Sequence, residues 1–117
     1  MRIISFSKKW LKLEHSEFTT FRVPRKDSAL GRDWHKDEVV QVYYHSRCPN
    51  REYLGTAKII DKVPCEIGDI TDSEAMADGF PGGWQEMINW LKSAHGSKLD
   101  LGMPINKLTL VWVDKVF

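Results

Sequence analysis

One stretch of the sequence, ITDSEAMADGFPGGWQEMINWL at residues 70–91, constrains the fold more than any other. Thr71 and Glu74 have the spacing of a capping box, in which each side chain accepts a hydrogen bond from the other residue's backbone N–H. A helix is therefore predicted to begin there. It must be short, because Gly79 favours a left-handed C-terminal stop and the proline two residues later cannot continue the helix.

A second helix is predicted to begin near residues 81–83 and to end at Gly96. Four apolar residues follow one another at i, i+3, i+4 and i+7, which places them on one face of a helix. They are Trp84, Met87, Ile88 and Leu91. Two helices joined by a tight corner must bury their apolar faces against another part of the domain, so the rest of the chain has to supply that partner.

The size and charge of the chain limit what it can be. Its 117 residues are enough for one hydrophobic core, so we expect a single domain over residues 1–117. The formal net charge is only +1, so binding to nucleic acid would have to depend on a local basic patch. Neither an apolar run of the about 20 residues of a membrane helix nor a signal peptide is present, and we expect a soluble, cytoplasmic protein.

The cysteines and histidines do not have the spacing of metal ligands. Cys48 and Cys65 do not form a Cys-x-x-Cys pair, which argues against a zinc site or a disulfide framework and favours reduced thiols. The histidines also lack ligand spacing; they are His15, His35, His45 and His95. We therefore expect no metal and no cofactor.

Most of the remaining chain is predicted to form strands, because β-branched and aromatic residues dominate it. The predicted strands cover residues 2–6, 17–23, 38–44, 54–63 and 107–117, with a short helix over residues 8–13. The strands do not alternate with helices, so a parallel doubly wound sheet is disfavoured. The predicted fold class is α+β: a small mixed β-barrel, largely antiparallel, with two to three helices packed against an open end.

Several motifs occur in this order along the chain. The second predicted strand ends in Arg22, and the segment WHKDEVVQVYY follows it. Residues 47–59 read R-x-x-x-R-E-x-L-G-T-A-K-I, and residues 74–80 read E-A-x-x-D-G-F. In these motifs the chain resembles an ASCH domain, a member of the PUA-like β-barrel superfamily. The resemblance covers nearly the whole chain and implies a PUA-like barrel with a cleft beside its helices.

The resemblance also names candidate catalytic residues. The family's usual signature on the second strand is G-x-K-x-x-E-x-R, and this sequence has His15, Glu17, Thr20 and Arg22 at those four positions. Some members resemble an amidohydrolase that removes the acetyl group from N4-acetylcytidine, using a lysine three residues before a threonine and a glutamate elsewhere. Thr20 matches that threonine, while Glu17 stands at the lysine position. The resemblance thus implies Thr20 and Glu74 as catalytic residues.

In that case another amine would have to replace the missing lysine, and the nearby candidates are Lys8, Lys9 and Lys12. The capping box already explains Glu74, which favours a structural role for its carboxylate. The hydrolase therefore stands as the alternative function, acting on a modified nucleoside or on RNA.

Basic and aromatic residues predict binding to RNA or single-stranded nucleic acid. Arg22 shares the polar face of its strand with Thr20 and can form bidentate bonds to a phosphate or a base edge; a salt bridge to Glu74 or Asp78 is the structural alternative. Trp34 lies in a polar loop and is predicted to stack a base, whereas the other four tryptophans fall in periodic segments and are assigned to packing. The predicted nucleic-acid-binding residues are Arg22, Arg25, Trp34, Arg47 and Arg51.

A third possibility is an interaction module whose basic loops bind an acidic protein partner. The sequence leaves these alternatives open. Nucleic-acid binding in a basic cleft between the barrel and the helices is the preferred interpretation.

Overall fold

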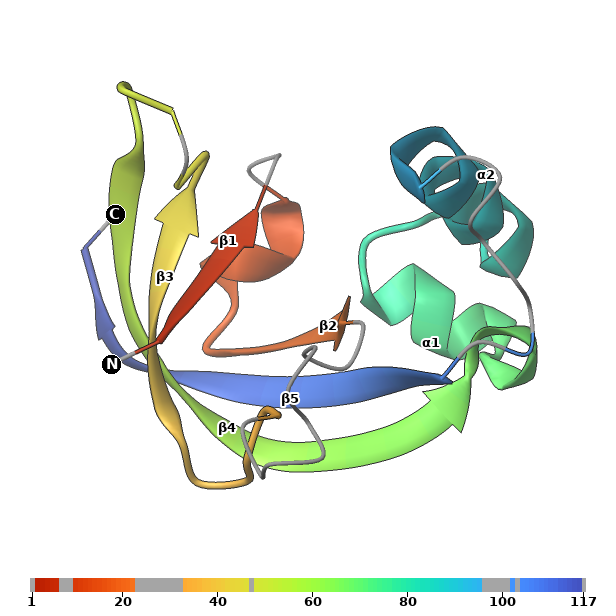
Figure 1. The fold of residues 1–117 in the computed structure, drawn as a ribbon, viewed down its shortest axis with the longest axis horizontal. Coiled ribbons are helices and arrows are strands. Elements are labelled where there is room, and N and C mark those ends of the chain that lie inside the picture. The colour runs from red at the N-terminus through yellow and green to blue at the C-terminus, as the bar shows by residue number, and fades with distance from the viewer. Residues whose placement is uncertain are drawn as a thin grey trace.

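The computed structural model describes residues 2–6, 10–22, 33–46, 48–95, 102 and 104–116. Over these residues the chain is a small mixed α+β domain in which five strands form one sheet, in the order β1-β3-β4-β5-β2. The sheet curls into a half-barrel (Figure 1). Its strands are β1 (Ile3–Phe6), β2 (Glu17–Arg22), β3 (Val39–Tyr44), β4 (Glu52–Glu66) and β5 (Pro104–Lys115).

The sheet is largely antiparallel, as the sequence predicts. β4 pairs with both β3 and β5 in antiparallel fashion, β2 pairs with β5 in the same way, and only the β1–β3 pair of the described sheet is parallel. β4 and β5 approach so closely at Gly55 that a Cβ atom there would lie 2.0 Å from the Asp114 carbonyl oxygen. This position, with φ +138°, therefore requires glycine.

Two α-helices follow β4 in sequence. They are α1 (Asp72–Ala77) and α2 (Trp84–His95), and two 3₁₀ helices accompany them, η1 (Leu11–Glu14) and η3 (Ile67–Asp69). Figure 1 shows α1 and α2 together at the end of the curled sheet where β4 finishes and β5 begins. The coarse prediction of a barrel-like sheet with helices at one end is thus confirmed.

The helix pair forms as its local sequence predicts. Both hydrogen bonds of the capping box are present between Thr71 and Glu74. After α1 the backbone turns at Gly79, whose φ is +115°. On α2, Met87 and Ile88 are each only 1% exposed, in agreement with the predicted apolar stripe.

The buried residues form two clusters. The larger lies inside the curled sheet, and its members are Ile4, Phe6, Leu13, Phe18, Trp34, Val40, Val42, Leu54, Ala57, Ile59, Leu108 and Leu110. The smaller lies around the helices and consists of Ile67, Ile70, Ala75, Phe80, Met87, Ile88 and Ile105. Trp10, just before η1, packs against both clusters and so lies at their boundary.

No helix in the described part of the chain is both long enough and apolar enough to cross a membrane.

Candidate functional site

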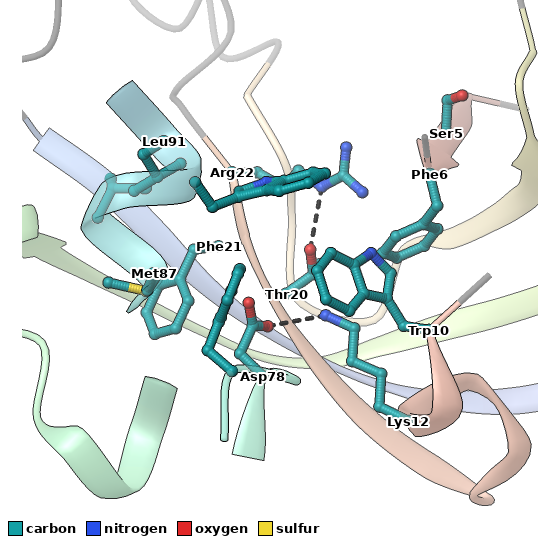
Figure 2. A pocket seen from close by; sticks show the side chains of 13 residues that line it. Ser5, Phe6, Trp10, Lys12, Thr20, Phe21, Arg22, Asp78, Met87 and Leu91 are labelled. Carbon is teal, nitrogen blue, oxygen red and sulfur yellow. Dashed lines mark hydrogen bonds and ion pairs between the residues drawn. The ribbon is translucent and has the colours of Figure 1, made fainter. Parts of the chain in front are cut away.

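A cavity of about 370 Å³ lies between β1, η1, β2, α2 and the corner that joins α1 to α2 (Figure 2). Its volume falls within the range of about 300–1,000 Å³ that is usual for small-molecule sites. Aromatic rings supply much of its wall; they come from Phe6, Trp10, Phe21, Phe80 and Trp90. Its polar lining consists of Ser5, Lys12, Thr20, Arg22 and Asp78. An aromatic cavity with a few convergent polar groups is the usual composition of a ligand site.

β2 brings Thr20 and Arg22 into this cavity. Because side chains alternate along a strand, the two residues point to the same face of β2, as the sequence predicts. Thr20 is buried, at 4% exposed, and its hydroxyl accepts a hydrogen bond of 3.1 Å from Arg22 Nε. The Arg22 guanidinium also lies over the Phe6 ring, with its Cζ atom 4.7 Å from the ring centroid.

The surroundings of Arg22 leave part of its guanidinium available. Burial lowers the pKa of Arg22 to about 10, and the Asp78 carboxylate partly offsets this, so the side chain remains charged at neutral pH. Within the described residues, its one hydrogen bond is the Nε bond to Thr20. The terminal nitrogens therefore remain able to donate to a ligand in the cavity, and an arginine fork suits a ligand with two adjacent acceptors.

A buried ion pair between Lys12 and Asp78 forms another side of the cavity. Lys12 Nζ lies 2.9 Å from Asp78 Oδ1, and the two side chains are only 7% and 9% exposed. The amine also lies near two aromatic rings, 5.3 Å from the Phe6 centroid and 5.7 Å from that of Trp10. Figure 2 shows this pair next to the Thr20 hydroxyl.

Burial shifts both members of the pair toward their neutral forms. It lowers the pKa of Lys12 and raises the pKa of Asp78, and in each case the partner's charge opposes the shift. Among the described residues that line it, the cavity thus holds two basic groups, Lys12 and Arg22, against one carboxylate, Asp78. This excess of basic groups favours a ligand that carries negative charge or exposed oxygen atoms.

The sequence did not predict this ion pair, although it offers Lys12 as one of three candidate amines. The periodicity of residues 8–13 predicts that the lysines point outward, which is wrong for Lys12. Leu11–Glu14 forms the tighter 3₁₀ helix η1, and the buried Asp78 carboxylate compensates the charge of Lys12. Asp78 is identified in the sequence only as part of a helix stop and as one alternative partner for Arg22. Its position in the E-A-x-x-D-G-F corner was the signal that could have marked it.

Glu74 lies outside the set of residues that line this cavity. Its carboxylate completes the capping box with Thr71 and accepts a hydrogen bond of 2.8 Å from Lys107 Nζ. The bonds from Lys107 and Thr71 lower the pKa of Glu74. The structure therefore does not bring Glu74 together with Thr20, whereas Asp78, one helical turn further along, lines the same cavity as Thr20.

The predicted base-stacking role of Trp34 is wrong. Trp34 is only 5% exposed and belongs to the cluster inside the sheet, and the Arg2 guanidinium covers its ring at 4.9 Å. The polar residues around it in the sequence conceal its burial, because a single aromatic residue gives no periodicity to interpret.

Of the predicted binding arginines other than Arg22, Arg51 is the one that the structure describes, and it does not line the cavity. Arg51 lies at the exposed β3–β4 hairpin tip, with its Cζ atom 5.3 Å from the centroid of the Tyr43 ring. Arg25 and Arg47 lie outside the described residues. Of the residues predicted from the sequence, the structure brings Thr20 and Arg22 together.

Trp90 is partly exposed, although the sequence assigns it to packing. It is 38% exposed and lines the cavity, and its ring centroid lies 5.4 Å from that of Trp10 in a T-shaped contact. Its place next to Leu91, at the edge of the apolar stripe of α2, was the available sequence signal.

Among residues 2–6, 10–22, 33–46, 48–95, 102 and 104–116, no group of three or more histidine, cysteine, aspartate or glutamate side chains has an arrangement that would hold a metal ion. Comparisons of the chain with protein-family models, with curated proteins and with solved structures found no match.

Proposed function

We propose that this chain is an ASCH-type, PUA-like domain that binds RNA or single-stranded nucleic acid by taking one nucleobase into the cavity beside β2. One observation carries the proposal: the Arg22 guanidinium lies against the Phe6 ring in an aromatic cavity, with its terminal nitrogens unbonded to other described residues. The curled, largely antiparallel sheet with helices at one end supports the PUA-like part of the proposal.

The cavity suits a nucleobase on chemical grounds. The edge of a base presents adjacent oxygen and nitrogen acceptors, which an arginine fork can bind in bidentate fashion. The aromatic walls offer surfaces on which a base can stack, a contact that contributes about 1–3 kcal/mol per base. The second basic group, Lys12, favours a ligand whose phosphates lie close by, so the affinity should fall as salt increases.

A titration with short RNA and single-stranded DNA tests this proposal, with binding followed by fluorescence anisotropy at about 50 mM and about 200 mM salt. Arg22→Met should bind at least about tenfold more weakly, because charge-assisted hydrogen bonds contribute about 1.5–3 kcal/mol each. Lys58→Met is the matched control; it removes a positive charge from a residue that does not line the cavity, and should bind within about twofold of the wild type. Absence of binding at the lower salt, or equal loss in both variants, would refute the proposal.

A second candidate function is hydrolysis of an amide on a modified nucleoside. The observation that favours it is that the Thr20 hydroxyl and the buried Lys12 amine, whose pKa burial lowers, line the same cavity. Lys12 from η1 would supply the amine that the Glu17 position lacks. Asp78 would hold that amine through its 2.9 Å hydrogen bond.

In this reaction the Thr20 oxygen attacks the amide carbonyl while a neutral Lys12 amine accepts the hydroxyl proton. Arg22 stabilises the negative oxygen of the tetrahedral intermediate, and the Lys12 ammonium returns the proton to the departing amine. Water then hydrolyses the acyl-threonine. A lowered lysine pKa helps, because it increases the fraction of neutral amine at neutral pH.

Incubation with N4-acetylcytidine, followed by mass detection of cytidine, tests the second candidate. Thr20→Val removes the hydroxyl with little change of volume and should abolish release of cytidine. Thr19→Val is the matched control on the same strand; the Thr19 hydroxyl is buried without a hydrogen-bond partner among the described residues, so its loss should leave activity unchanged. Unchanged substrate with the wild-type protein removes this candidate.

A further inference from the structure

A second cavity, of about 710 Å³, adjoins the first. The two cavities have four lining residues in common, which are Trp10, Lys12, Phe80 and Trp90. These shared residues form the wall between the two spaces. A ligand that fills the first cavity therefore lies one layer of side chains away from the second.

Three of the four residues in the shared wall are aromatic, and their rings contact one another. Trp10 contacts both Phe80 and Trp90 edge to face, with ring centroids 5.2 Å and 5.4 Å apart. Behind it, a Cβ atom on Gly79 would lie 2.9 Å from the Trp10 ring, so the missing side chain allows the indole to lie against the backbone. A wall of this kind presents rigid aromatic surface to both cavities.

The second cavity also exposes apolar side chains. Met76 on α1 is 55% exposed and Trp90 on α2 is 38% exposed, and both line this cavity. The rest of the lining includes the uncharged Ala77 and Pro81 and the titratable side chains of Lys12, His15 and Glu86. Exposed aromatic and thioether surface next to a ligand cavity is suited to a flat, weakly polar group such as a base.

We infer that the second cavity binds the nucleotide next to the one held in the first, with its base against Trp90 and Met76. The site would thus recognise two consecutive nucleotides on the two sides of the Trp10–Trp90 wall. This inference rests on the proposed nucleic-acid binding. Its support is the continuity of the two cavities, since single-stranded nucleic acids commonly bind by stacking successive bases on aromatic side chains.

The length of the ligand tests the inference. We would measure the affinity of the wild-type protein for cytidine monophosphate, a cytidine dinucleotide and a cytidine trinucleotide at one salt concentration. The dinucleotide should bind about tenfold or more tightly than the mononucleotide, because a second base gains a stacking contact. The third nucleotide should increase the affinity much less than the second does.

Met76→Glu places a carboxylate in the second cavity alone, since Met76 does not line the first. This variant should lose the gain from the second nucleotide and keep its affinity for the mononucleotide. Val113→Glu is the matched control; Val113 is 60% exposed on β5 and lines neither cavity, so it should keep the full gain. Thermal unfolding of both variants checks that they fold.

The outcomes separate the two proposals. If the wild-type protein binds the mononucleotide and the dinucleotide equally, or if Met76→Glu and Val113→Glu behave alike, the two-nucleotide site is wrong while the proposed function stands. If none of the three ligands nor a longer RNA binds, both are wrong.

Discussion

Two carboxylates lie four residues apart, Glu74 within α1 and Asp78 at its C-terminal cap, and the comparison between them separates a structural group from a functional candidate. Glu74 lies 2.8 Å from Lys107, and Asp78 lies 2.9 Å from Lys12. The distances are nearly equal, yet the surroundings differ. The Lys107 and Glu74 side chains are 27% and 31% exposed, whereas those of Lys12 and Asp78 are 7% and 9% exposed.

The two carboxylates respond to these surroundings in opposite directions. Hydrogen bonds from Lys107 and Thr71 lower the pKa of Glu74, whereas burial raises the pKa of Asp78 in spite of its lysine partner. A partly exposed ion pair whose carboxylate also caps a helix is explained by the stability of the helix. The stability of the helix does not explain a buried pair whose ionised forms are disfavoured. Ionisable groups with shifted pKa values are common at functional sites.

The largest expected effect comes from replacing each pair by apolar residues. Burial disfavours both charges of the Lys12–Asp78 pair. The double variant Lys12→Met/Asp78→Leu should therefore keep the free energy of unfolding of the wild type or raise it by up to about 4 kcal/mol. The same variant should lose ligand binding. The double variant Lys107→Met/Glu74→Leu should lower the free energy of unfolding by about 1–2 kcal/mol and leave ligand binding intact. Urea unfolding and the RNA titration measure the two effects. If Lys12→Met/Asp78→Leu unfolds the protein, Lys12 and Asp78 have a structural role.

A smaller effect is expected at the beginning of α1. Thr71→Ala removes the hydroxyl that accepts the Glu74 backbone N–H, and should lower the free energy of unfolding by about 1 kcal/mol. Ser73→Ala, at an exposed position in the same turn, is the control and should change it by no more than about 0.5 kcal/mol. The urea midpoint reports both. Equal effects of the two variants would show that the cap contributes little.

The smallest effect is a difference in pH dependence. The folded-state pKa of Glu74 lies below 4.5, so its contribution to stability is fully present above pH 4.5 and is lost as the pH falls through the folded value. The folded-state pKa of Asp78 lies above 3.8, so on acidification the folded protein takes up this proton before the unfolded chain does, and Asp78 then adds to stability.

Urea unfolding of the wild type, Glu74→Gln and Asp78→Asn from pH 7 to about pH 3 measures this difference. The stability advantage of the wild type over Glu74→Gln should shrink as the pH falls, while the stability of the wild type relative to Asp78→Asn should rise. If the stability difference from the wild type changed with pH in the same direction for both variants, the two carboxylates would have the same kind of environment.

Features that depend only on neighbouring residues can be predicted from the sequence. The capping box at Thr71 and the turn at Gly79 are local, so the beginning and end of α1 follow from a few adjacent side chains. The alternation of β2 is local as well, and it correctly placed Thr20 and Arg22 on one face.

Tertiary structure alone decided which charged groups meet and which aromatic rings are covered. Lys12 and Asp78 are 66 residues apart, and no local pattern reports that a lysine will be buried against a distant carboxylate. Trp34 is buried although its sequence neighbours are polar, and Trp90 remains partly exposed beside a buried stripe. Burial is set by what packs against a residue, so the sequence could identify the helix pair at residues 70–91 but not the cavity beside it.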